Sequence, residues 1–208
     1  MQRSYQQNCA LAHALDQVGE RWTLLIVREL LVSPRRYSEL LENLAGIGTN
    51  LLASRLRTLE AQGIIGKSGH LYSLTEFGRR LEPVVHELVR FGLALGIDDD
   101  AENLTRPEWD IVALRALYRS DVAAGLEGRY VLELNGFPFC IEKVGDDVNI
   151  HNADIDNPRI RVSLSKAIAR KLANEEISYN NAVRRKSIRV SGSEREAKKL
   201  LRSFSIVP

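Results

Sequence analysis

Residues 37–63, YSELLENLAGIGTNLLASRLRTLEAQG, contain two amphipathic stretches joined by a short segment with two glycines. Apolar residues recur every three or four positions in each stretch, as a helix with one buried face requires. They are Tyr37, Leu40, Leu41 and Leu44, followed by Leu52, Leu56 and Leu59. The segment 45–48 breaks the first stretch, and Gly63 ends the second. We therefore predict two helices joined by a tight turn, the pattern of a helix-turn-helix.

Two helices are expected before this pair. The first carries Leu11, Ala14, Leu15 and Val18 at helical spacing and stops at Gly19. The second carries Trp22, Leu25, Ile26, Leu30 and Leu31. It should end at Ser33, because a proline disfavours helical geometry in the residue before it.

A hairpin is expected after the pair. Residues 64–67 and 70–74 flank Ser68-Gly69, a plausible tight turn, and Thr75 can cap a long closing helix. These helices, the two-stranded wing and the closing helix make residues 1–97 a mainly α winged helix-turn-helix domain.

Such a module binds DNA by placing its second helix of the pair in the major groove. If the leucines of 49–62 face inward, the side chains that face outward are Thr49, Asn50, Ala53, Ser54 and Arg57. Asparagine can pair with adenine and arginine with guanine through two hydrogen bonds each. The alternative interpretation of these polar side chains is an ordinary solvated helix face.

Other polar residues are better placed to contact phosphates, which fix the register of the protein on DNA but carry no sequence information. They are Arg35, Arg36, Ser38 and Arg55, with Lys67 and His70 at the tip of the wing. A net charge of +2 does not contradict DNA binding, because only a local basic patch is needed.

Short motifs spread over residues 9–96 resemble those of the HxlR-type winged-helix transcriptional regulators of bacteria. They are Cys9, GERWTLLI at 19–26, REL at 28–30, PRRYSEL at 34–40, GI at 46–47, Leu52, RL at 55–56, LE at 59–60, Gly63 and YSLTEFG at 72–78. The resemblance implies a homodimer formed by the first and last helices of the domain, with one winged helix on each half of a double-stranded operator.

This sequence departs from the family pattern at two places. Alanine follows Cys9 where proline is usual, and the fourth helix opens with Gly-Thr-Asn at 48–50 instead of Ser-Pro and a basic residue. Because of the second departure, the resemblance does not indicate which bases the helix contacts.

Cys9 has two interpretations. A thiol near a helix N-terminus can have a lowered pKa and sense oxidants, as in some members of the resembled family. Free cysteine is also commonly a small buried hydrophobe, and no basic residue flanks Cys9 closely. Cys140 lies between Phe139 and Ile141, so we expect it to be inert packing in a sheet.

The 208 residues, 44% of them hydrophobic, suffice for two domains. Residues 98–128 carry 3 basic and 8 acidic residues between two mildly basic ends, which predicts an acidic linker at 98–105. Charges interrupt every apolar run before the roughly 20 residues that a membrane span needs. The N-terminus lacks an apolar signal core, so we expect a cytoplasmic protein without membrane contact.

Residues 106–208 change from helical to alternating periodicity. Strands are expected around 130–134, 137–141, 148–150, 160–164 and 187–191, with Asn135-Gly136 as a hairpin turn. Ser165 and Ser193 should cap helices. The predicted class is α+β, an antiparallel sheet with helices on one face.

This order of elements resembles the sterol-carrier-protein-like fold. The resemblance implies an apolar slot between sheet and helices that could hold a hydrophobic small-molecule effector. Its candidate lining residues are Leu132, Leu134, Phe137, Phe139, Ile141 and Leu172. The alternative is that these side chains fill a solid core.

No catalytic pattern is present: the sequence lacks a P-loop, HExxH, GxSxG and CxxC. His70, His86 and His151 fall in different elements without ligand spacing, so neither a metal nor a cofactor is expected. The leading hypothesis is a dimeric transcriptional regulator, a repressor rather than an activator and not an enzyme. The alternative is a carrier of lipid-like ligands whose winged helix is a platform for protein interaction.

Overall fold

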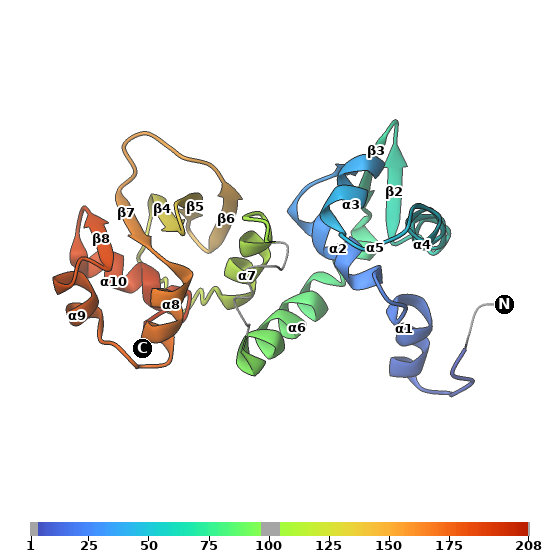
Figure 1. The fold of residues 1–208 in the computed structure, drawn as a ribbon, viewed down its shortest axis with the longest axis horizontal. Helices are drawn as coiled ribbons and strands as arrows, with labels where there is room; N and C mark the ends of the chain where they lie inside the picture. The colour runs from blue at the N-terminus through green and yellow to red at the C-terminus, as the bar shows by residue number, and fades with distance from the viewer. Residues whose placement is uncertain (1–3, 97–104, 208) are drawn as a thin grey trace. The chain divides into compact units, whose positions relative to one another are not determined.

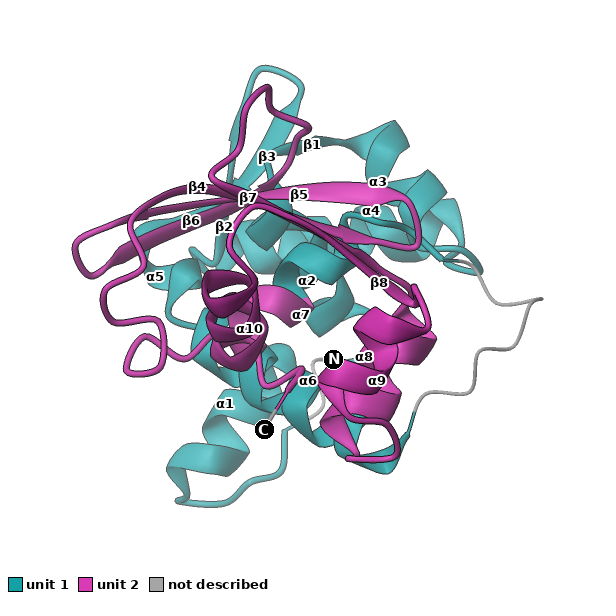
Figure 2. Cartoon of the chain, turned by 90° about the vertical axis from the view of Figure 1, so that its left-hand side faces the viewer, with its two compact units in different colours: residues 1–112 teal, residues 113–208 magenta. Residues whose placement is uncertain are grey.

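The computed structural model describes residues 4–96 and 105–207, and the chain divides into two compact units, 1–112 and 113–208 (Figure 2). The predicted acidic linker at 98–105 lies, apart from Thr105, outside the described residues. Among the residues that are described, no helix is both long and apolar enough to cross a membrane.

The first unit has the element order of a winged helix-turn-helix (Figure 1). Its elements are α1 (Ala10–Val18), α2 (Thr23–Val32), β1 (Arg35–Arg36), α3 (Tyr37–Asn43), α4 (Thr49–Ala61), β2 (Ile65–Ser68), β3 (Leu71–Leu74), α5 (Glu76–Arg79) and α6 (Glu82–Leu95), with the start of α7 (Trp109–Leu117). The predicted helix pair is thus α3 and α4. The inward leucines Leu52, Leu56 and Leu59 are buried, as the periodicity required.

The turn between α3 and α4 depends on Gly46. Its φ is +90°, a conformation that residues with a Cβ rarely adopt. A Cβ at this position would lie 3.7 Å from the Trp22 ring, an ordinary contact distance, so the backbone conformation and not a lack of space favours glycine. Glycine therefore allows the chain to reverse and start α4 one short turn after α3.

The wing has three strands rather than two, in the order β1-β3-β2. Arg35 pairs with Tyr72 and Arg36 with Leu71. The predicted turn at Ser68-Gly69 is displaced by one residue, because Ser68 already pairs with Leu71. The two-residue turn is therefore Gly69-His70, with Gly69 at φ +59°.

The predicted long closing helix is divided. Thr75 caps only α5, by accepting a hydrogen bond from the Gly78 amide at 3.0 Å. Pro83 lies in the first turn of α6, where a missing N–H costs nothing, but it could not continue a helix from α5.

A buried carboxylate joins three helices of the first unit. Glu29 on α2 has no exposed surface, and its oxygens accept hydrogen bonds from the Arg28 guanidinium, from Asn43 Nδ2 at 2.8 Å and from Trp109 Nε1 at 2.7 Å. The Arg28 guanidinium also stacks 4.0 Å from the Trp109 ring centroid. Burial lowers the pKa of Arg28, and the charge of Glu29 opposes this effect. The network connects α2 with the end of α3 and the start of α7.

This network places the end of the first unit later than the sequence suggested. Arg106 pairs with Glu42 at 2.8 Å, and Val112 belongs to the same apolar core as α2, α3 and α4. Residues 106–112, which we assigned to the second domain, therefore pack with the first unit.

The second unit consists of a five-stranded sheet with helices on one side (Figure 2). Its elements are the end of α7, β4 (Gly128–Leu134), β5 (Phe137–Val144), β6 (Asp147–Asn152), β7 (Ile160–Leu164), α8 (Lys166–Ala173), α9 (Tyr179–Arg184), β8 (Ile188–Ser191) and α10 (Glu194–Ser203). The hairpin turn at Asn135-Gly136 and the caps at Ser165 and Ser193 occur as predicted.

The sheet is mixed, not purely antiparallel as predicted. Its strand order is β6-β5-β4-β7-β8, and β7 runs parallel to β4. The reason is the long connection after β6, which carries the chain past β5 and β4 and inserts β7 at the far side of β4. Hydrophobic alternation defines which face of a strand is buried, but it does not define its direction.

We predict that Glu29→Ala lowers the free energy of unfolding of the first unit by about 2–4 kcal/mol, because it leaves the half-buried Arg28 without its counter-charge and the Asn43 and Trp109 donors without their acceptor. Both tryptophans, Trp22 and Trp109, lie in this unit, so tryptophan fluorescence during urea unfolding reports on it alone. The matched control is Glu87→Ala on α6, where the Glu87–Arg90 pair is exposed and the change should stay within about 0.5 kcal/mol. Equal losses in both variants would contradict the role of Glu29.

Candidate nucleic-acid interface

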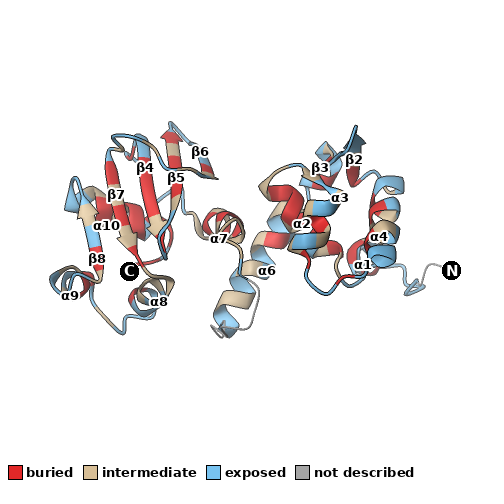
Figure 3. Ribbon diagram, turned by 45° about the horizontal axis from the view of Figure 1, so that its top comes forward, coloured by how far each residue is buried: buried red, intermediate tan, exposed pale blue. Residues whose placement is uncertain are grey.

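Helix α4 presents a polar face away from the core of the first unit. Thr49, Asn50, Ser54 and Arg57 are exposed and Ala53 is half-buried, while the leucines of the same helix are buried (Figure 3). The Tyr37 hydroxyl donates to the Thr49 carbonyl at 2.8 Å, which ties the start of α3 to the start of α4. The structure thus brings together the side chains that the sequence assigned to base contacts.

Leu51 is a residue of this face that the sequence analysis missed. Its side chain is 38% exposed next to Asn50, at the edge of the polar surface. An exposed apolar group there could contact a thymine methyl in the major groove. Its position outside the Leu52, Leu56 and Leu59 stripe was the available signal.

The wing carries basic residues on a shared sheet face. Arg35, Tyr72 and Lys67 are directly paired across β1, β3 and β2, so their side chains leave the sheet on the same side. Lys67 Nζ lies 5.2 Å from the Tyr72 ring centroid, a cation–π arrangement. We expected Arg35 to contact phosphates from the segment before α3. It lies in the wing instead, because residues 35–36 form strand β1, which the sequence did not predict.

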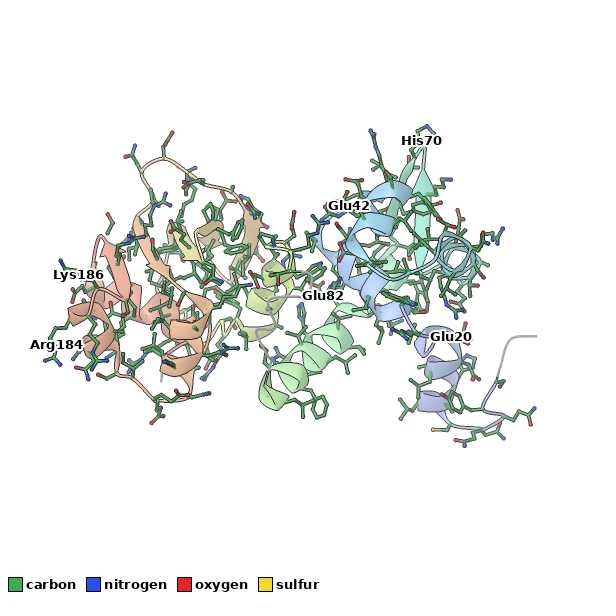
Figure 4. All side chains as sticks on the ribbon, viewed as in Figure 1. Glu20, Glu42, His70, Glu82, Arg184 and Lys186 are labelled. Carbon is green, nitrogen blue, oxygen red and sulfur yellow. The ribbon has the colours of Figure 1, made fainter. Side chains whose placement is uncertain are left out.

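Three of the remaining residues predicted to contact phosphates have exposed side chains. Arg36 and Ser38 are exposed at the start of α3, where the Arg36 amide donates to Glu39 at 2.6 Å. His70 lies at the tip of the wing (Figure 4). These three side chains remain exposed next to the polar face and the wing.

Arg55 is instead engaged within the protein. Its guanidinium donates to Glu20 Oε2 at 2.7 Å, which links α4 to the segment between α1 and α2. Glu20 neutralises the charge that we assigned to a phosphate contact. The partner lies 35 positions away in the sequence, so no local pattern indicated it.

Cys9 is exposed at the N-cap of α1. The backbone amides of Ala12 and Leu11 favour the thiolate and lower the pKa of the thiol. Cys140 is buried in β5, and burial raises the pKa of its thiol. The two cysteines therefore differ in accessibility and in the direction of their pKa shifts.

Two helices of the first unit expose apolar stripes. On α6 these are Val84, Leu88, Phe91 and Leu95, spaced by four, three and four residues, with Phe91 63% and Leu95 71% exposed. On α1 two of the helically spaced apolar residues, Leu11 and Leu15, are exposed. Only Ala12 and Val18 of α1 are buried, and Figure 1 shows this helix extending away from the others of its unit.

The residues expected to line an apolar slot in the second unit are mostly core. Leu132, Leu134, Phe139, Ile141 and Leu172 are all buried, and Leu132, Phe139 and Leu172 expose no surface at all. A side chain with no exposed surface does not border an open slot. Phe137 differs, being 46% exposed beside the Asn135-Gly136 turn.

The second unit also gathers a group that the sequence analysis missed. Cys140 and Glu142 on β5 and His151 on β6 place one ligand atom each within 4.8 Å of one another. We expected no metal site because the histidines lack ligand spacing along the sequence. Strand pairing nevertheless places His151 beside Cys140.

The comparisons with known proteins concern the first unit. Residues 17–98 match the model of the HxlR-like helix-turn-helix family. The chain is 36% identical over 91 residues to the uncharacterized HTH-type transcriptional regulator sll1512 of Synechocystis, covering 40% of this chain and 67% of that protein. It is 31% identical to the HTH-type regulator YybR of Bacillus subtilis, covering 41% of this chain and 74% of the relative.

Among solved structures, the chain is similar to the redox regulator HypR in its oxidized form. The identity is 32%, the TM-score is 0.40, and the match covers 41% of this chain and 96% of HypR. On the match to the family model and the identity to these two curated relatives, the chain belongs to the HxlR-like family of helix-turn-helix transcriptional regulators, with its DNA-binding domain in the first unit.

Proposed function

We propose that this protein binds an operator in double-stranded DNA as a homodimer, with α4 of each protomer in the major groove, and that it acts as a repressor without catalytic activity. A dimer seated on promoter DNA would exclude the transcription machinery from the same surface.

The exposed polar face of α4 carries this proposal. It combines an amide (Asn50), a guanidinium (Arg57) and two hydroxyls (Thr49 and Ser54), which offer donors and acceptors for base edges. The neighbouring Arg36, Lys67 and His70 supply side chains for phosphates. Arg55 remains a predicted phosphate contact, and its ion pair with Glu20 also helps to position α4.

The apolar stripes of α1 and α6 support the homodimer. Large apolar side chains aligned along one helix face are unfavourable in water and mark an interaction surface. A second copy of the chain would cover Leu88 and Phe91 and pair two α4 helices for the two halves of an operator. The alternative, a winged helix that only binds other proteins, makes a different prediction for the polar face of α4.

We predict that the double variant Asn50→Ala, Arg57→Ala loses operator affinity, because each two-bond base contact is worth about 1–3 kcal/mol. Operators would be selected from a random duplex pool and affinities measured by fluorescence anisotropy across salt concentrations. Wild-type affinity should fall steeply with salt, since phosphate binding releases counterions.

The matched control is Asn180→Ala, Arg184→Ala, which removes the same two side-chain types from the exposed surface of α9 in the second unit. It should retain wild-type affinity. Unchanged binding by the α4 variant, or equal losses in both, would exclude base recognition by α4 and favour the protein-interaction alternative.

A second prediction concerns the dimer. Leu88→Glu with Phe91→Glu places charges in the α6 stripe, where association would have to desolvate them, so this variant should be monomeric by light scattering and bind operators more weakly. The control Glu87→Ala with Arg90→Ala changes the neighbouring ion pair of α6 and should remain dimeric. A wild-type chain that is monomeric at micromolar concentration would contradict the homodimer.

A third prediction concerns Cys9. Its lowered pKa makes the thiolate available at lower pH, so half-maximal alkylation should occur at lower pH in the native chain than in urea. Cys140 is the internal control and should react only after unfolding. Mass spectrometry after diamide treatment identifies the modified residue. Sensing further requires that modification changes operator affinity in the wild type and not in Cys9→Ser.

A further inference from the structure

The cross-strand group in the second unit has the chemistry of a metal site. Cys140 on β5 is directly paired with His151 on β6, and Glu142 follows two positions along β5. Directly paired residues and residues two apart on a strand leave a sheet on the same side. One ligand atom from each therefore converges, all within 4.8 Å of one another.

We propose that Cys140, Glu142 and His151 form a binding site for a thiophilic divalent cation, with Zn²⁺ as the best chemical match. Thiolate, imidazole and carboxylate are the three ligand types that zinc takes in proteins, whereas magnesium and calcium prefer oxygen ligands alone. This inference is independent of the proposed DNA binding.

The spacing suits such an ion. Bonds of about 2.0–2.3 Å in tetrahedral geometry place ligand atoms roughly 3.3–3.8 Å apart. A group already within 4.8 Å reaches that spacing by small side-chain rotations, without a change in strand pairing. Three protein ligands leave one position open for water or another ligand.

Two of the three proposed ligand residues, His151 and Glu142, have side-chain atoms that make few or no hydrogen bonds within the protein. His151 Nδ1 is buried and has no hydrogen-bond partner among the described residues. Glu142 accepts one long hydrogen bond, from Asn149 Nδ2 at 3.5 Å. Its directly paired neighbour on β4 is Arg129. A buried polar atom without a partner is unfavourable, and a cation at this place would satisfy it.

The thiol would exchange its proton for the metal. Burial, and secondly the charge of Glu142, raise the pKa of Cys140, so the free thiol is protonated. On coordination the sulfur releases this proton to solvent and forms its bond to the cation as a thiolate. Glu142 and His151 are only half-buried and β6 is an edge strand, so the ion can enter from solvent.

The test uses the full chain without an affinity tag, stripped with a chelator and titrated with Co²⁺ alone. We expect one cobalt per chain, a thiolate-to-cobalt charge-transfer band, and displacement of cobalt by Zn²⁺ but not by Mg²⁺. Absence of the band would overturn the proposal.

Variants assign the ligands. Cys140→Ser should abolish the charge-transfer band, and His151→Gln and Glu142→Gln should each weaken Zn²⁺ binding by at least the roughly 10- to 100-fold that loss of an outer-shell partner costs. Circular dichroism identifies variants that fail to fold. Glu142→Gln changes a half-buried side chain without changing its shape, so it keeps the test decisive even if Cys140→Ser unfolds.

The matched controls are Cys9→Ser and His70→Gln, which remove the same two side-chain types from exposed positions in the first unit. Both should bind zinc as the wild type does. Loss of the band in Cys9→Ser, or wild-type affinity in the folded Glu142→Gln and His151→Gln variants, would show that the cation binds elsewhere.

Discussion

The arrangement of the first unit depends on the buried carboxylate of Glu29. A charge without contact with water must be fully hydrogen-bonded, and here the donors come from α2, α3 and α7. Asn43 fixes the end of α3, and Tyr37, at the start of the same helix, fixes the first turn of α4. The surface proposed to read DNA is therefore held by a chain of polar contacts that begins in the interior.

In the first unit, the exposed polar surface and the exposed apolar surfaces lie on different helices. Helix α4 places polar groups opposite its leucines, whereas α1 and α6 leave apolar groups exposed. A surface that binds DNA needs polar groups of both hydrogen-bonding types, and a surface that binds another copy of the chain needs apolar area. The two requirements are met on different helices, so neither surface compromises the other.

In the second unit, the hydrophobic pattern of the strands does not reveal which polar residues the sheet brings together. One face, with Leu132, Phe139 and Ile141, is buried as the alternating pattern indicated, but Val131 and Cys140 are buried on the other face as well. The opposite side of β5 and β6 carries Cys140, Glu142 and His151, whose chemistry becomes apparent only when the strands are paired. A cysteine that looked like ordinary packing thus becomes part of a group with ligand character.

The sequence by itself determined the features that rest on local interactions. Helix periodicity, the Asn135-Gly136 turn, the caps at Ser165 and Ser193 and the outward face of α4 all depend on residues a few positions apart. Only the tertiary structure decided the strand β1, the Glu20–Arg55 pair, the parallel pairing of β4 with β7 and the Cys140–His151 contact. These depend on which distant segments become neighbours, and the free energy that selects those neighbours comes from packing the whole unit, which no short stretch of sequence encodes.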